Sequence, residues 1–381
     1  MRGRRACCVA LVAVVAHALD EHLFYDLTDG RATFKVAAGY KHILGWIAVK
    51  RSERLVSAWV HAAMAATPAG EAGTMLDIGA NAGYFGLMSI ALGGRAVFFD
   101  PQPACWAAID SALQVNRFAD RGWIVRHPLA SSAAPKLFDV TGTTCKGTYP
   151  LVIGKGGRNS PDAYGSPMDK GRKGRRRYVE TTTLEAAAAG LPGSIGAAVR
   201  DGPIQMVKVD VEGAEIGLLR HNLLPLFRER RVRHCVVEVT PTAWRFAANT
   251  SFADALRMGA RLIMQIASYG YVVHSRYARA SAGHAGPSGV SEGPSGPLAP
   301  LELTAVANET ALIAHLQRIR KTTHMGQEDL HFSLREDGAL APAAHAALEM
   351  VTCCAVLRGR SKAQCACNIT QHRALEPTPV T

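Results

Sequence analysis

The chain has 381 residues, of which 48% are hydrophobic and 19% are charged, a balance that excludes a mostly disordered protein. No apolar run reaches the roughly twenty residues that an ordinary transmembrane helix needs. The net charge is +12, but it is concentrated in the first residues and in residues 170–177. Few aromatic side chains interleave with these charges, which argues against a nucleic-acid partner.

Residues 1–18 have the parts of a secretory signal peptide. Arginines follow the initial methionine, residues 6–18 are apolar apart from one histidine, and Ala16-His17-Ala18 has the small-x-small pattern of a cleavage site. We expect cleavage after Ala18, which would place the mature protein in the lumen of the endoplasmic reticulum or Golgi, or outside the cell. An uncleaved signal anchor and a mitochondrial leader are the alternatives.

Residues 19–73 form a cap segment with a predicted helix over residues 53–66. In residues 74–337, short apolar runs alternate with helical segments, a pattern that predicts an α/β fold built on a mostly parallel sheet. The predicted strands of this domain are residues 75–78, 96–99, 123–126, 137–140, 205–211, 235–239, 271–274 and 331–334. Its predicted helices are residues 84–92, 103–115 and 214–219.

Two segments interrupt this pattern. Residues 141–178 and 279–300 are rich in Gly, Pro and Ser and show no apolar period, so we expect exposed, flexible insertions. The basic run at residues 170–177 has three interpretations. It is a solvated loop, a contact for an anionic substrate such as a sulfated or uronic glycan, or a proprotein-cleavage site.

Residues 338–381 form a Cys-rich tail, and its four cysteines are Cys353, Cys354, Cys365 and Cys367. In an oxidising compartment they would pin the tail by disulfides; a zinc site is the alternative, although CC and CxC spacings lack the usual CxxC geometry. Seven of the nine cysteines remain after removal of the leader, so one thiol stays free or pairs with another chain. Glycosylation sequons at Asn249, Asn308 and Asn368 agree with a lumenal protein.

A glycine-rich turn follows the first strand of the domain. Asp77 lies near the end of this strand, and Gly79, Asn81 and Gly83 come before the next helix. Glycines at such a turn allow a ligand to approach the backbone, and the amino end of a helix favours polar or anionic groups. Asp100 follows the next strand, where a carboxylate can accept hydrogen bonds from two ribose hydroxyls. We therefore expect these five residues to bind a cofactor.

The residue types in this turn favour S-adenosylmethionine over a dinucleotide. A dinucleotide-binding turn has a second glycine that makes room for the pyrophosphate, and Asn81 stands at that position. S-adenosylmethionine has no phosphate but carries an α-amino group and a sulfonium, and an acidic residue such as Asp77 suits that cation. A dehydrogenase is accordingly disfavoured, and a tight turn without a ligand is the remaining alternative.

A second group of acidic residues follows the strand at residues 205–211. Asp210 and Glu212 lie at its carboxyl end, where open α/β sheets bind their ligands, and Glu238 lies near the end of the neighbouring strand. A carboxylate there can take the proton from an acceptor hydroxyl. A divalent metal held by Asp210 and Glu238 could acidify the hydroxyl instead, and both alternatives stay open. Glu215 falls in the first turn of the next helix, where it would complement the helix dipole.

Together, these motifs resemble those of the FkbM-type S-adenosylmethionine-dependent methyltransferases. The matching residues are Leu76-Asp-Ile-Gly-Ala-Asn-Ala-Gly-Tyr-Phe85, Asp100-Pro101, Asn116, Thr183-Leu184-Glu185, Val207-Lys-Val-Asp-Val-Glu-Gly-Ala-Glu215 and Val236-Val-Glu238. The first motif is shared by many methyltransferases, whereas Lys-x-Asp-x-Glu-Gly-x-Glu is much more specific to this family. The resemblance covers about residues 74–335.

The resemblance implies a Rossmann-like class I methyltransferase with a mostly parallel seven-stranded sheet, whose last strand, residues 331–334, runs antiparallel. It also implies S-adenosylmethionine as the cofactor and O-methylation of a hydroxyl on a carbohydrate or small metabolite. The leader, the basic insertion and the Cys-rich tail are unusual for the family and leave the acceptor open. A non-catalytic secreted binding protein on the same fold is the alternative, and the intact acidic residues argue against it.

Overall fold

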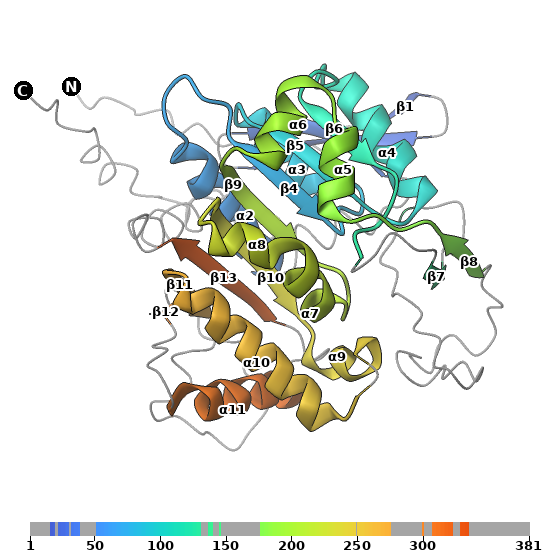
Figure 1. Ribbon diagram of the computed structural model, residues 1–381. Coiled ribbons are helices and arrows are strands. Elements are labelled where there is room, and N and C mark those ends of the chain that lie inside the picture. The colour runs from blue at the N-terminus through green and yellow to red at the C-terminus, as the bar shows by residue number, and fades with distance from the viewer. Residues whose placement is uncertain are drawn as a thin grey trace, which may run out of the picture.

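The computed structural model shows an α/β domain with a small antiparallel sheet beside it (Figure 1). The residues that it describes are 16–19, 22–29, 32–38, 51–130, 136–139, 145, 176–248, 250–275, 299–300, 307–322 and 328–334. The expected Cys-rich tail, two of the three sequon asparagines (Asn249 and Asn368) and most of both expected insertions lie outside these residues, whereas the sequon at Asn308 falls in the first turn of a described helix, residues 307–322. Among the described helices, none is both long and apolar enough to cross a membrane.

The main sheet has the strand order β12-β11-β13-β10-β9-β4-β5-β6. Its strands are β4 (Thr74–Ile78), β5 (Arg95–Phe99), β6 (Gly122–Val125), β9 (Ile204–Val209), β10 (Val232–Val239), β11 (Tyr271–Ser275), β12 (Ala299–Pro300) and β13 (Glu328–Leu334). β13 runs antiparallel to both of its neighbours, β10 and β11, while β6, β5, β4, β9 and β10 pair in parallel. The predicted seven-stranded Rossmann-like sheet with an antiparallel last strand is confirmed, and the two-residue β12 extends its edge.

Helices cover both faces of this sheet (Figure 1). One face carries α5 (Leu184–Gly190), α6 (Gly193–Arg200), α10 (Phe252–Ser268) and α11 (Ala307–Thr322), and the other carries α2 (Arg51–Ala65), α3 (Tyr84–Ala91) and α4 (Pro103–Val115). Strand side chains alternate between the two cores: Leu76 faces the first, and its neighbour Met75 faces the second. Because both faces are buried, the strands read as continuous apolar runs.

The end of the leader and the start of the cap segment form a sheet that the sequence did not predict. Its strands β1 (Ala16–Leu19), β2 (His22–Asp29) and β3 (Ala32–Ala38) are antiparallel. Asn116, at the end of α4, docks this sheet: its side-chain amide donates to the carbonyl of Lys35 and accepts from the N–H of Lys35, both at 2.7 Å. Asn116 therefore anchors the cap. The expected cleavage after Ala18 would remove all but the last residue of β1.

Helix α2 packs on the sheet through a column of aromatic rings. Trp59 stacks on His331 of β13, with ring centroids 3.4 Å apart. The rings of His234 in β10 and His274 in β11 lie 5.9 and 5.7 Å from that of His331. All four side chains are buried. Burial lowers the pKa of all three imidazoles, because the charged form would lose its water.

The helix predicted over residues 214–219 is longer than expected, and it continues to Arg228 in three pieces. α7 (Glu215–Leu218) leads into a π-helical turn, η3 (Leu219–Leu223), and then into α8 (Leu224–Arg228). The turn buries Asn222, which accepts from the N–H of Leu184 and donates to the carbonyl of Ala130. These tertiary hydrogen bonds explain why the helix departs from its regular period.

The remaining described elements lie at the carboxyl edge of the sheet. α9 (Pro241–Ala247) follows β10. β7 (Lys136–Asp139) and β8 (Arg176–Val179) form a separate two-stranded sheet. The strand predicted over residues 137–140 thus exists but does not join the main sheet, and the expected insertion 141–178 ends in a strand.

Candidate active site

The glycine-rich turn after β4 contacts the segment after β9. Gly79 has φ +77°, and a Cβ there would lie 1.7 Å from the carbonyl oxygen of Asp210. In turn, the N–H of Asp210 donates to the carbonyl of Ile78 at 3.0 Å. Gly83, with φ +78°, precedes the first turn of α3. Only glycine fits at position 79, so the expected cofactor turn and the acidic motif are brought together by their backbones.

Asp100 holds the cofactor turn from the next strand. Its Oδ2 accepts from the N–H of Asn81 at 2.9 Å, and its Oδ1 accepts from the N–H of Gln102 at 2.8 Å. Burial raises the pKa of Asp100 to about 7. Each carboxylate oxygen has a second lone pair, which leaves acceptor capacity for ribose hydroxyls. Asp100 therefore both shapes the turn and can contact a nucleoside.

Asp77 is fully buried beneath the same turn. Its Oδ2 accepts from the N–H of Gly86 at 2.9 Å, whereas its Oδ1 has no hydrogen-bond partner among the described residues. Burial raises the pKa of Asp77 to about 6, against the lowering effect of the Lys208 cation. A buried acceptor without a donor is costly. The site thus fits a ligand that brings a donor or a cation, as the α-amino group of S-adenosylmethionine would.

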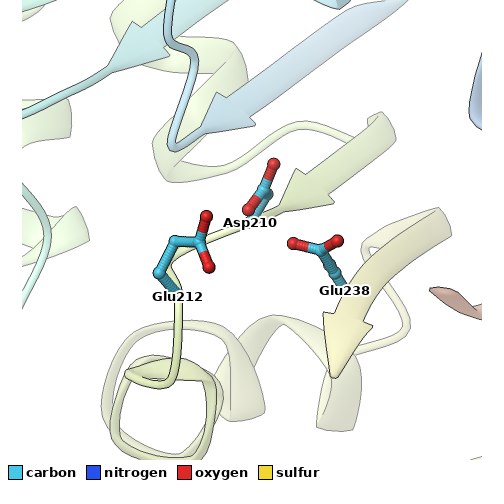
Figure 2. A group of neighbouring side chains, drawn as sticks. All are labelled: Asp210, Glu212 and Glu238. Carbon is cyan, nitrogen blue, oxygen red and sulfur yellow. The ribbon is translucent and has the colours of Figure 1, made fainter. Parts of the chain in front are cut away.

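Three carboxylates converge beside this turn (Figure 2). Asp210 follows β9 directly, Glu212 lies in the next turn with φ 51°, and Glu238 comes from β10. One oxygen of each lies within 4.8 Å of the others, and all three side chains are partly buried. The sequence predicted this group, because the carboxyl ends of parallel strands meet at one edge of a sheet.

The three carboxylates differ in charge. Lys208 Nζ lies 3.0 Å from Asp210 Oδ2, an ion pair that favours the charged form of Asp210. Burial, followed by the charge of Asp210 and a hydrogen bond with it, raises the pKa of Glu238 well above its usual value. These effects favour the neutral form of Glu238. Asp210 and Glu212 remain as the carboxylates that can accept a proton.

Lys208 is a site residue that the sequence reasoning missed. Besides its contact with Asp210, its Nζ donates to the carbonyl of Gly79 at 3.3 Å and lies 5.3 Å from the ring centroid of Phe85. Lys208 thus connects the cofactor turn to the carboxylates. The available signal was a lysine between two valines in an otherwise apolar strand, since a buried lysine is rare without a partner.

Glu215 has a structural role. It is fully buried, and its carboxylate accepts from the N–H of Gly213 and from Nε1 of Trp244, both at 2.7 Å. These bonds fix the turn that carries Glu212. The expected dipole contact of Glu215 is therefore secondary to its hydrogen bonds.

Thr183 also has a structural role, because its hydroxyl caps α5 by accepting from the N–H of Ala186.

The three converging carboxylates also fit a divalent cation. Mg²⁺ and Ca²⁺ bind carboxylate oxygens, and the ligand oxygens of Asp210, Glu212 and Glu238 are close enough to share one ion. A cation there would favour the charged form of Glu238, against the effect of burial. The same geometry therefore serves either a proton acceptor or a metal site.

One comparison with known proteins, the match to a family model, agrees with this geometry. Residues 77–273, just over half of the chain, match the methyltransferase FkbM domain. A solved structure described as the bifunctional kinase-methyltransferase WbdD is similar over 55% of this chain, with 10% identity and a TM-score of 0.28. The match covers 34% of the WbdD chain. The search of curated proteins found no match. The chain belongs to the FkbM methyltransferase family.

Proposed function

We propose that this protein is an S-adenosylmethionine-dependent O-methyltransferase that acts on a hydroxyl of a carbohydrate or small metabolite. The observation that carries this proposal is the contact between Gly79 and Asp210. It sets a turn suited to the cofactor against carboxylates suited to proton transfer. Aligning an acceptor with a methyl donor at near-contact distance supplies much of the acceleration of such a reaction.

S-adenosylmethionine, when bound, supplies an electrophilic methyl group on a sulfonium. Asp77 would bind its α-amino group through the unpartnered Oδ1, and Asp100 would accept from the ribose hydroxyls. The acceptor hydroxyl would lie against Asp210 and Glu212. As the oxygen formed its bond to the methyl carbon, the carbon–sulfur bond would break to leave a neutral thioether, and one of these carboxylates would take the hydroxyl proton. The Lys208 cation favours the charged form of Asp210, which is the form that can accept a proton.

A divalent cation is the second candidate for activating the hydroxyl. Asp210, Glu212 and Glu238 would hold it, and its charge would lower the pKa of the bound hydroxyl. The two alternatives differ in a simple test. Chelator treatment abolishes turnover if a metal is required, whereas a carboxylate base keeps working after the metal is removed.

We place the reaction in the secretory pathway. The leader-like first 18 residues and the three sequons support this location. A disulfide between Cys105 and Cys145 gives further support, since disulfides persist in oxidising compartments. Sequencing the amino terminus of protein made in a secretory host should return a chain that begins near Leu19, and a chain that retains Met1 would contradict the expected cleavage.

Calorimetric titration with S-adenosylmethionine, followed by transfer of a labelled methyl group to a panel of glycans and small alcohols, tests the proposed activity. The parent should bind the cofactor and methylate at least one hydroxyl compound. Asp210→Asn should bind within about tenfold of the parent, yet turn over on the order of a hundredfold to ten-thousandfold more slowly. Binding without transfer to any acceptor would favour the non-catalytic alternative, and binding of a nicotinamide cofactor instead would favour a dehydrogenase.

A further inference from the structure

A buried disulfide lies against the expected cofactor turn. It joins Cys105, in the first turn of α4, to Cys145, with their Cα atoms 4.6 Å apart and a sequence separation of 40. Both side chains are almost inaccessible to water. Cys235 is also buried, and it is an unpaired thiol among the described residues. The pairing could not be read from the sequence, because spacing alone does not determine connectivity.

Cys145 touches the central residue of the cofactor turn. Its Sγ lies 3.0 Å from Oδ1 of Asn81. A disulfide sulfur carries no proton, so this is a packing contact between the sulfur and the side-chain amide. Asn81 has φ 52°, a left-handed conformation that is uncommon outside glycine and that asparagine adopts more readily than most residues. Cys145 is one of the groups that hold it.

The other half of the disulfide is tied to Asp100. The N–H of Cys105 donates to the carbonyl of Gln102 at 3.0 Å, and the N–H of Gln102 donates to Asp100. One residue beyond Cys105, Trp106 Nε1 donates to the carbonyl of Asp100 at 2.7 Å. The start of α4 is therefore fixed to the carboxylate that accepts from Asn81.

The disulfide closes a ring of contacts around the cofactor turn. The N–H of Asn81 is held by Asp100, the backbone of Asp100 is held by the start of α4, and Cys105 of that helix brings Cys145 back to the side chain of Asn81. Breaking the S–S bond would free Cys145 to leave Asn81. No other link in the ring would be cut.

We propose that the Cys105–Cys145 disulfide is a positioning element of the cofactor site, which holds Asn81 in its binding conformation. This inference rests on the proposed function, since it takes the turn to be the site for S-adenosylmethionine. The reduced protein keeps its fold but binds the cofactor at least tenfold more weakly. The enzyme would therefore work at full affinity only where the disulfide is oxidised.

Calorimetry with S-adenosylmethionine, before and after treatment of the full chain with a water-soluble phosphine, is the first test. The phosphine reduces the S–S bond to two thiols, and water supplies the two protons and the oxygen of the phosphine oxide. Mass spectrometry of the alkylated protein confirms which cysteines have been reduced. Both the reduced parent and a Cys105→Ala/Cys145→Ala variant should bind at least tenfold more weakly than the oxidised parent.

A double-mutant cycle separates positioning from a general loss of stability. If the disulfide acts through Asn81, then Asn81→Ala alone weakens binding, and removing the disulfide from that variant adds less than about twofold. A disulfide that only stabilises the fold would weaken binding by the same factor in both backgrounds, and that result overturns the proposal. Circular dichroism at the titration temperature should show that all four proteins are folded.

Two controls address the other cysteines. Cys235→Ala should bind S-adenosylmethionine within about twofold of the parent and respond to the phosphine as the parent does. The Cys105→Ala/Cys145→Ala variant should show no further change when the phosphine is added; a further loss would assign the effect to other cysteines and overturn the inference.

Equal affinity of the oxidised and reduced parent for S-adenosylmethionine would refute the positioning role of the disulfide but not the proposed function. An oxidised parent that does not bind the cofactor refutes the proposed function itself.

Discussion

At the scale of single residues, the site depends on the distribution of charge among four side chains. Lys208 neutralises Asp210, Asp210 and Glu238 share a hydrogen bond, and Glu212 completes the group. Burial and the charge of Asp210 raise the pKa of Glu238, while the Lys208 cation favours the charged form of Asp210. The arrangement therefore places a carboxyl that favours its neutral form beside one that favours its charged form.

Lys208→Met tests this distribution. Without the cation, the ionised form of Asp210 loses its partner, so the acidic limb of the pH profile of kcat should move to higher pH. We expect kcat at neutral pH to fall by about tenfold to a hundredfold. Lys208→Arg keeps the positive charge and should retain most of the activity. A pH profile of Lys208→Met that coincides with that of the parent would remove Lys208 from the proton balance.

Asp100 should affect binding rather than turnover. Asp100→Asn keeps the size of the side chain but replaces one acceptor oxygen by an NH₂ group, which faces a backbone donor. We expect S-adenosylmethionine to bind about 1–3 kcal/mol more weakly, measured by calorimetry. The reduced affinity should be present at saturating acceptor as well. An unchanged Kd in a folded variant would place the cofactor elsewhere.

At the scale of elements, the two loops that follow β4 and β9 form one unit. The close approach of Gly79 to the carbonyl of Asp210 leaves no space for a side chain. Glu215 fixes the second loop through Gly213 and Trp244. The geometry of the proposed site is therefore determined by backbone contacts more than by the carboxylates themselves.

Gly79→Ala and Gly93→Ala form a matched pair for this contact. Both glycines have positive φ, of +77° and +97°, but nothing lies within 4 Å of a Cβ at Gly93. Gly93→Ala should therefore cost only the left-handed backbone penalty, about 1–2 kcal/mol in urea denaturation. Gly79→Ala adds a steric clash with backbone and should cost well over 3 kcal/mol or prevent folding. Equal losses in the two variants would mean that the loops can separate freely.

The elements that sequence could predict are those whose signals are local. Short apolar runs between helical segments predicted the strands of the main sheet. The glycines after β4 predicted the turn that approaches Asp210. The convergence of Asp210 with Glu238 followed from the rule that parallel strands end at one edge. In each case, a few neighbouring residues carried the information.

What the sequence did not reveal depends on distant contacts. The burial of Lys208 arises from Gly79 and Phe85, which are more than a hundred residues away in the chain. The pairing of Cys105 with Cys145 depends on the path of the chain between them. The π-helical turn exists because Asn222 bonds to segments outside its own helix. A lysine between two valines hints at the first of these interactions, but no local pattern identifies the partners in any of them.

At the scale of the whole molecule, pH acts through two opposed sets of buried groups. The three imidazoles stacked beneath α2 are neutral in the fold, and the unfolded chain protonates them below about pH 6.5. Their contribution to stability is lost as the pH falls. Asp77, Asp100 and Glu215 have raised pKa values of about 6, 7 and 7. These carboxyl groups affect stability in the opposite direction to the imidazoles. The stability that they contribute is lost as the pH rises from about 4 towards 7.

His331→Phe isolates one member of the first set while keeping a ring for Trp59 to stack on. Between pH 7 and pH 5, the free energy of unfolding of the parent should fall by about 2 kcal/mol relative to that of the variant. Urea denaturation at both pH values measures this difference. The exposed His221→Gln, which lies outside the column, should follow the parent. Parallel behaviour of the parent and His331→Phe would show that the fold does not keep His331 neutral.

Removal of the leader after Ala18 would change the edge of the cap sheet. β1 forms one edge of that sheet, where Ala16–Leu19 pairs with residues 22–25 of β2. Without β1, the backbone groups of β2 on that side would lose their partners, and an open strand edge is a template for pairing with another chain. In the precursor, β1 would thus cover the edge of β2 and prevent self-association there. Cleavage would expose that edge in the processed protein.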